Sequence, residues 1–158
     1  MPGSVIVAGA RTPIGKLSGA FAGFTAMDLG GVAIAAALER SGLSPDQVDY
    51  VFMGQVLQAG QGQITARQAA TKGGVSMSVP ATTVNKVCLS GLNSIYLADL
   101  LIGAGEAEVV VAGGPGRGDP HRVPVAALCP QILGWRAGLA PWARRHQEVW
   151  ASPVRLRR

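Results

Sequence analysis

The sequence predicts an α/β fold in which helices cover a mainly parallel β-sheet, followed by an irregular C-terminal tail. Short apolar runs rich in β-branched residues alternate with longer helical patterns along residues 1–114, as in right-handed β-α-β crossovers. The runs lack the alternation of apolar and polar residues that marks a half-exposed strand, so we expect strands buried on both faces. A length of 158 residues allows one hydrophobic core of ordinary domain size.

Four strands and three helices are predicted, in strict alternation and without an internal repeat. The predicted strands are 4–8, 50–53, 81–84 and 108–112. The predicted helices are 25–40, 64–71 and 89–102, with one further helical turn at 44–46. Each strand is separated from the next by enough residues for a crossover helix, which parallel pairing requires.

The early elements have clear ends in the sequence. The first strand ends at Gly9. The first helix begins with a capping box, in which the Thr25 hydroxyl and the Asp28 carboxylate satisfy amides of the first turn. Gly42 ends this helix, because glycine adopts the left-handed cap conformation without a side-chain penalty. Pro45 suits the first position of the next helical turn.

The later helices and strands are predicted from their composition more than from residues that mark where they begin and end. Residues 64–71 form a helix fragment, and 81–84 form a strand that contains two threonines and a valine. The helix at 89–102 is apolar nearly all round, so we expect it to be buried on several sides. The strand at 108–112 is closed by Gly113 and a second glycine.

Residues 115–158 differ sharply from the rest in composition. Residues 1–114 carry six basic and seven acidic side chains, whereas the tail carries eight arginines, no lysine and two acids, with all three tryptophans and both histidines. Gly, Ala, Arg and Pro, which GC-rich codons encode, supply 24 of its 44 residues. We interpret 115–158 as a divergent basic tail, irregular or translated from a shifted reading frame. A basic solvated extension is the alternative interpretation.

Composition also excludes several classes of protein. With 48% hydrophobic and 15% charged residues, a wholly disordered chain is excluded. Two cysteines do not make a disulfide framework, no run reaches the ~18 apolar residues of a membrane span, and the N-terminus lacks a signal-peptide pattern. We therefore expect a cytoplasmic protein. No carboxylate pair or cysteine-histidine cluster has metal-ligand spacing, so we expect no metal.

One cysteine stands where the sequence predicts chemistry. The segment 85–91, NKVCLSG, places Cys88 between a strand and the first turn of the apolar helix. Free amides and the dipole at a helix N-terminus favour a thiolate, which is the nucleophilic form. Lys86 adds a nearby positive charge. Ser90 and Gly91 are small, so the backbone can approach a bound thioester closely, and amides of the turn can donate to its oxyanion. On these physical grounds alone a packing role for Cys88 stays open.

Five ordered segments carry a resemblance to a known family. They are VAGARTPIG at 7–15, MGQV at 53–56, ARQAA at 66–70, NKVCLSG at 85–91 and VVVAGG at 109–114. Together they resemble the N-terminal half of the thiolase family, and in particular the acetyl-CoA acetyltransferases. The resemblance covers about residues 4–114, which we take as a partial thiolase N-terminal domain.

The resemblance implies an activity and a site. Cys88 matches the family's nucleophile, which takes an acyl group from acyl-CoA as an enzyme-bound thioester; acetoacetyl-CoA is then formed or cleaved. Coenzyme A thioesters are substrates, and no bound cofactor, nucleic acid or membrane partner is implied. Family members are homo-oligomers, with residues 67–84 near the subunit contact.

The family's second half supplies a Gly-His-Pro histidine and a Cys-x-Gly cysteine, and neither pattern occurs here: His121 follows proline, His146 follows arginine, and Cys129 precedes proline. We therefore expect a truncated transferase of lipid metabolism that does not turn over alone. Two alternatives remain. The chain is a non-enzymatic half that pairs with another thiolase chain, or a basic module that acts through Trp135, Trp142 and their neighbouring arginines.

Overall fold

The computed structural model describes residues 4–13, 19–115 and 128–133, the last at the level of the backbone. The strands are β1 (Ile6–Gly9), β2 (Tyr50–Gly54), β3 (Ala81–Val84), β4 (Val110–Gly114) and β5 (Leu128–Leu133). The helices are α1 (Ala26–Ser41), α2 (Thr65–Lys72) and α3 (Ser90–Gly103), with a 3-10 turn at Pro45–Gln47. All the elements predicted within residues 1–114 are present, with ends that differ by a few residues.

The strands form one five-stranded sheet in the order β1-β5-β4-β2-β3. β2 pairs in parallel with both β3 and β4, while β5 is antiparallel to both of its neighbours, β1 and β4. β1, β2, β3 and β4 therefore run in one direction, and the prediction of a mainly parallel sheet is confirmed. Their carboxyl ends lie at one edge of the sheet, where α/β proteins carry their functional residues.

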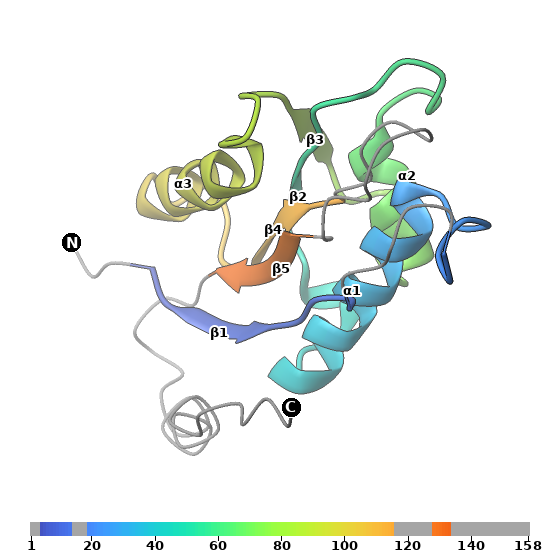
Figure 1. Ribbon diagram of the computed structural model, residues 1–158. Helices are drawn as coiled ribbons and strands as arrows, with labels where there is room; N and C mark the ends of the chain where they lie inside the picture. The colour runs from blue at the N-terminus through green and yellow to red at the C-terminus, as the bar shows by residue number, and fades with distance from the viewer. Residues whose placement is uncertain (1–3, 14–18, 116–127, 134–158) are drawn as a thin grey trace, which may run out of the picture.

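Helices lie on both faces of the sheet, and β2 and β4 are buried, as their apolar runs predicted. The expectation is wrong for the first strand, where Val5 is 48% and Ile6 46% exposed. α1 and α2 lie on one side of the sheet and α3 on the other (Figure 1). Successive residues of a strand point to opposite faces, so β2 and β4 contribute to two separate cores. The core on the side of α1 and α2 includes Val51, Met53 and Val111, and the core beneath α3 includes Phe52, Val110 and Ala112.

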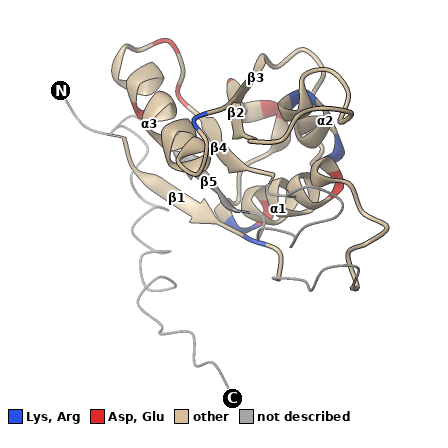
Figure 2. Cartoon of the chain, turned by 45° about the horizontal axis from the view of Figure 1, so that its top comes forward, with Lys and Arg blue, Asp and Glu red and all other residues tan. Residues whose placement is uncertain are grey.

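The ends of α1 follow the sequence signals. The Thr25 hydroxyl accepts from the Asp28 amide at 3.1 Å, and the Asp28 carboxylate accepts from the Thr25 amide at 2.7 Å, which completes the capping box. Gly42 ends the helix in the left-handed conformation at φ 70°. Lys72 of α2 forms an ion pair with Asp28 and so ties the first turn of α1 to α2. Elsewhere the described charged residues are scattered rather than gathered on one face (Figure 2).

β5 is a strand that the sequence analysis did not predict. Residues 128–133 belong to the segment expected to be irregular, yet they form a strand between β1 and β4. A ladder is held by backbone N–H and C=O groups, and without β5 the facing edges of β1 and β4 would lack partners. Strand formation there needs no apolar side-chain pattern, and so it could not be recognised from the residue types alone.

The remaining predictions for the tail fall on Trp135, Trp142, His121 and His146, all of which lie outside the described residues. Cys129 belongs to β5, which is described only as backbone. Within the described part of the chain, no helix has the length and apolar character that a membrane crossing requires.

Candidate active site

Cys88 lies in the short turn that joins β3 to α3. Val84 is the last residue of β3, and α3 begins at Ser90, so the cysteine comes two residues before the helix. β3 pairs in parallel with β2, and this turn therefore stands at the carboxyl edge of the parallel strands. The thiol is free and exposed to solvent. The sequence prediction placed Cys88 at this position, between a strand and the first turn of the helix.

The turn has an unusual backbone at the residue before the cysteine. Val87 adopts φ 51°, in the left-handed region, which is costly for a β-branched residue. Its side chain is 64% exposed, so packing does not hold it in place. Hydrogen bonds account for the conformation instead: the Val87 amide donates to Asn85 Oδ1 at 3.1 Å, and the Val87 carbonyl accepts from Ser90 Oγ at 2.6 Å.

Ser90 and Asn85 connect this turn to the rest of the fold. Ser90 Oγ also accepts from the Lys86 amide at 2.9 Å, and the Ser90 amide donates to the Val87 carbonyl at 3.1 Å. Asn85 Nδ2 donates to the carbonyl of Val56 at 3.0 Å, in the loop that follows β2. The turn that carries Cys88 is therefore held by hydrogen bonds to the start of α3, through Ser90, and to the loop after β2, through Asn85.

The start of α3 rests directly on the end of β2. A Cβ atom added to Gly54 would lie 2.3 Å from the carbonyl carbon of Ser90 and 2.6 Å from the amide nitrogen of Gly91. Ser90 and Gly91 are both buried. The contact involves backbone atoms of residues 90 and 91, so it depends on the missing side chain of Gly54. That small residues at Ser90 and Gly91 make room for a thioester stays a prediction. The need for glycine at position 54 was not visible in the sequence, because only the folded chain brings it to α3.

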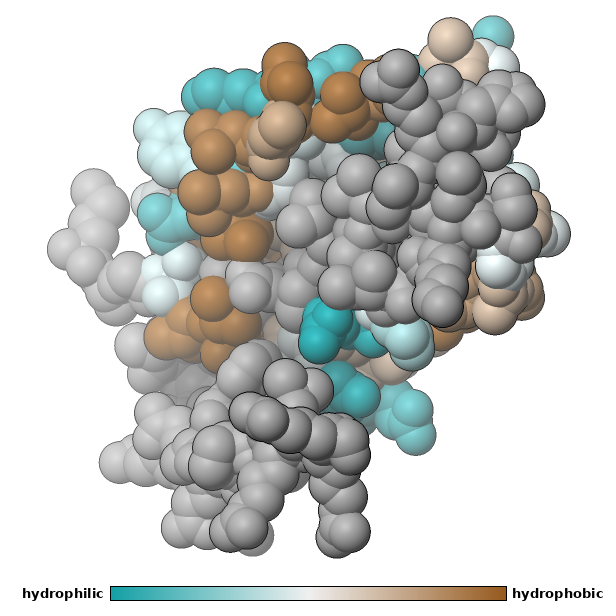
Figure 3. Space-filling model, viewed as in Figure 1, coloured by the Kyte–Doolittle hydropathy of each residue, from teal (hydrophilic) through white to brown (hydrophobic). Residues whose placement is uncertain are grey.

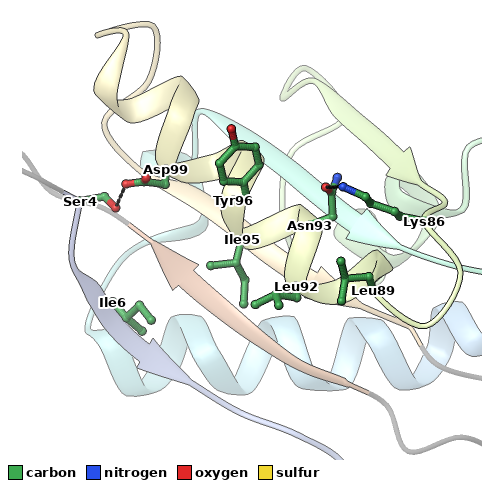
Figure 4. A pocket seen from close by; sticks show the side chains of 9 residues that line it. All are labelled: Ser4, Ile6, Lys86, Leu89, Leu92, Asn93, Ile95, Tyr96 and Asp99. Carbon is green, nitrogen blue, oxygen red and sulfur yellow. Dashed lines mark hydrogen bonds between the residues drawn. The ribbon is translucent and has the colours of Figure 1, made fainter.

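The Lys86 side chain reaches towards α3 and is exposed to solvent. Its ammonium donates to Asn93 Oδ1 at 3.2 Å, one turn into the helix (Figure 4). The predicted positive charge therefore stands on the flank of α3, two residues before Cys88 in the sequence.

A largely apolar groove of about 620 Å³ runs between α3 and the start of β1. Figure 4 shows Ile6, Leu89, Leu92 and Ile95 around it, with a hydrogen bond of 2.5 Å from Ser4 Oγ to Asp99 at one end. In the space-filling view, apolar side chains gather over this part of the molecule (Figure 3).

This groove corrects one prediction about α3. The helix was expected to be buried on several sides, but it buries mainly the face towards the sheet, with Ala98 and Ile102. Leu92 is 62% exposed and Tyr96 58% exposed. Apolar residues on every side of a helix show that each side is suited to burial, but they do not show that each side is buried. In the described part of this chain, only the side of α3 that faces the sheet is covered.

The described residues hold no group of three or more side chains suited to a metal ion. Cys88 offers a thiol on a hydrogen-bonded turn next to the start of α3, where the Ser90 amide donates to the Val87 carbonyl.

Fold and site together define an α/β protein that carries an exposed cysteine before a helix at the carboxyl edge of parallel strands. Comparison with known sequences then places it: the family model for "Thiolase, N-terminal domain" matches residues 4–117. The chain belongs to the thiolase family.

Individual relatives agree. A probable acetyl-CoA acetyltransferase of Mycobacterium leprae is 60% identical over 114 residues, which make up 72% of this chain and 29% of the relative. The corresponding protein of Mycobacterium tuberculosis is 59% identical over the same length. An acetyl-CoA acetyltransferase of Pseudomonas aeruginosa is 52% identical over 136 residues, 85% of this chain and 33% of the relative. That match extends into residues 115–158, so the point at which the resemblance ends differs among relatives. The chain spans about a third of the length of these proteins or less.

Proposed function

We propose that this chain is part of an acetyl-CoA C-acetyltransferase and that Cys88 is the nucleophile that accepts the acyl group. The observation that carries the proposal is the position of Cys88: an exposed thiol on a hydrogen-bonded turn, immediately before α3. The names of the relatives support acetyl-CoA as the substrate. A cytoplasmic location and assembly with further copies of the chain belong to the same proposal.

The first step joins Cys88 to the acyl group of an acyl-CoA. By the resemblance, the histidine that activates the cysteine belongs to the family's second half, so in this chain alone the thiol loses its proton to water. The Cys88 thiolate attacks the thioester carbonyl, a bond forms between Sγ and the acyl carbon, and the bond from that carbon to the coenzyme A sulfur breaks. Coenzyme A leaves as its thiolate and takes up the proton that Cys88 has lost. We assign the stabilisation of the charge that develops on the carbonyl oxygen to backbone amides of this turn that are not already bonded; those of Leu89 and Ser90 donate to the carbonyls of Lys86 and Val87.

The second step requires more than the described residues supply. In thiolysis or condensation the acyl group passes from Cys88 to a second nucleophile, which is coenzyme A or the α-carbon of another acetyl-CoA. Removal of the α-proton requires a positioned base. By the resemblance, the second cysteine, which acts as acid and base, belongs to a second half of the enzyme, as does the histidine that activates Cys88. We therefore propose acylation of Cys88 without turnover for this chain alone.

Intact-mass spectrometry tests the proposal. The 158-residue chain is incubated with acetyl-CoA, and Cys88→Ser is treated in parallel. We expect one acetyl adduct on the wild-type chain, its loss in Cys88→Ser, and its release by added coenzyme A. Absence of an adduct, or an adduct that persists in Cys88→Ser, would show that Cys88 is not the acyl acceptor.

The groove beside α3 favours a second candidate function, in which the chain is a non-enzymatic half that pairs with another thiolase chain. The exposed Leu92 and Tyr96 give such a partner an apolar face to cover. Co-expression with the remaining part of a relative from Mycobacterium tuberculosis tests this idea. Co-purification of the two parts with restored thiolysis supports pairing, whereas separate elution of two folded parts contradicts it.

The third candidate, a basic module that acts through the tail, depends on residues outside the described ranges. The division of the chain at Gly114 stays a prediction. Sequencing the gene downstream of that codon in all frames is its test.

A further inference from the structure

We propose that Ser90 is a positioning residue, whose hydroxyl holds Val87 in the left-handed conformation and thereby fixes the orientation of Cys88. The inference goes beyond the role proposed for Cys88 and rests on it. It concerns a side chain that does not itself touch the acyl group.

The geometry around Val87 points to this role. The Ser90 hydroxyl uses both of its hydrogen-bonding capacities within the turn: it accepts from the Lys86 amide at 2.9 Å and donates to the Val87 carbonyl at 2.6 Å. These two bonds, which we call the Ser90 bridge, span the residues on the N-terminal side of Cys88. Asn85 Oδ1 binds the Val87 amide from the exposed side of the same turn.

The Ser90 bridge is needed because Val87 does not favour its own conformation. A valine at φ 51° has its branched Cβ close to neighbouring backbone atoms, and its exposed side chain gains little from packing. Without the bridge, Val87 keeps only its bonds to Asn85 Oδ1 and to the Ser90 amide among the described residues, and the ordinary right-handed or extended conformations become easier to reach. A change of φ at Val87 rotates the peptide that follows it, and that peptide leads directly to the Cα of Cys88.

Ser90 also connects the cysteine turn to the sheet. It is 2% exposed, and its backbone rests on Gly54 of β2. The hydroxyl is therefore fixed relative to the sheet, whereas Asn85 is exposed. Of the two side chains that bind Val87, Ser90 is the one with a buried anchor.

Ser94 provides a matched control on the same helix. It is a fully buried serine one turn further along α3, and its hydroxyl donates to the Ser90 carbonyl at 3.0 Å. Ser94→Ala removes one buried hydroxyl, as Ser90→Ala does, without touching a bond to residues 86–88. A merely structural contribution of Ser90 would make the two variants behave alike.

The test measures the rate of acetylation of Cys88 by acetyl-CoA in the full chain, together with melting temperature. We expect Ser90→Ala to slow acetylation about tenfold, since small misplacements of a reacting group have large effects on rate. Ser94→Ala should stay within about twofold of wild type, even where both variants melt lower. Equal rates for the two variants would overturn the proposal.

Val87→Gly supplies a rescue that only a positioning role predicts. Glycine adopts the left-handed conformation without strain, so Val87→Gly should restore most of the rate lost in Ser90→Ala. A double variant as slow as Ser90→Ala alone contradicts the proposal. If Ser90→Ala does not fold, Asn85→Ala weakens the same Val87 conformation from the solvent side and is read in the same way.

Alkylation by chloroacetamide separates the positioning role from the proposed acyl transfer, because it needs no acyl-CoA. If the wild-type chain forms no acetyl adduct, the proposed function fails and the rate of Cys88 alkylation decides about Ser90. We expect Ser90→Ala to change that rate by more than about threefold and Val87→Gly to bring it back. An unchanged alkylation rate in Ser90→Ala overturns the inference.

Discussion

Replacing Gly54 by alanine should move the cysteine turn without changing any residue in it. The added methyl would lie 2.3 Å from the carbonyl carbon of Ser90 and 2.5 Å from its oxygen. Non-bonded carbons settle at about 3.5 Å, so strand and helix must separate by about 1 Å. The atoms in conflict belong to the backbone of α3, and no side-chain rotation relieves them.

The size of the effect follows from the rigidity of both partners. Added methylene groups in a packed core typically destabilise by about 1–3 kcal/mol. Because β2 lies between β3 and β4 and the opposing atoms are backbone, we expect the upper end, about 3 kcal/mol. For an ordered part of this size that corresponds to a melting temperature lower by about 10 °C.

Thermal unfolding followed by circular dichroism measures this loss, and the acetylation rate of Cys88 measures the displacement. Gly103→Ala is the matched control: it lies at the end of the same helix, and an added Cβ there meets nothing within 4 Å. It should leave the melting temperature unchanged or raise it slightly. A Gly54→Ala chain that melts within about 2 °C of wild type would refute the close contact between β2 and α3.

Three further changes test other parts of the fold. Hydrogen bonds from Lys72 and Thr25 lower the pKa of Asp28 from 3.8 to about 2, so its stabilising effect is complete above about pH 4 and disappears as the pH falls through 2. The difference in melting temperature between wild type and Asp28→Asn should shrink over that range, and a constant difference argues against the ion pair. Thr25→Ala removes the cap of α1 and should cost about 1 kcal/mol in denaturant unfolding; no change would mean that the cap is not formed in solution. Leu92→Lys should reduce concentration-dependent association in sedimentation velocity, because it places a charge on the uncovered face of α3; association equal to wild type would place the contact elsewhere.

Much of the fold was predictable because local signals and the global pattern agree. The capping box at Thr25 and the left-handed Gly42 were visible as residue types at fixed spacings, and both are present. The apolar strands indicated a sheet covered on both faces. β5 could not be predicted, because its place is set by the free edges of two strands that are distant in sequence.

The place of the candidate cysteine in the fold was predictable, but the contacts that hold its turn were not. The motif around Cys88 located the thiol before α3, because a cysteine at a strand-to-helix junction is recognisable from sequence. The role of Gly54 depends on a contact between β2 and α3, and the role of Val87 depends on its backbone angle φ. Neither feature can be recognised from the amino-acid sequence. A valine is, on propensity, an improbable choice for the left-handed region, so sequence reasoning would place the strain elsewhere.

The contacts that hold the Cys88 turn therefore all lie within the described part of the chain. The match to the relatives from Mycobacterium covers only 29% of the length of those proteins. β2 seats the start of α3 through Gly54, and Ser90, fixed by that contact, bonds to the turn on the N-terminal side of the thiol. None of these contacts involves the outer face of α3, where Leu92 and Tyr96 are exposed. Covering that face should therefore raise the stability of the chain while leaving the geometry of the turn as it is. The geometry of the cysteine turn and the covering of the outer face of α3 are for this reason separable, and each is open to measurement without the other.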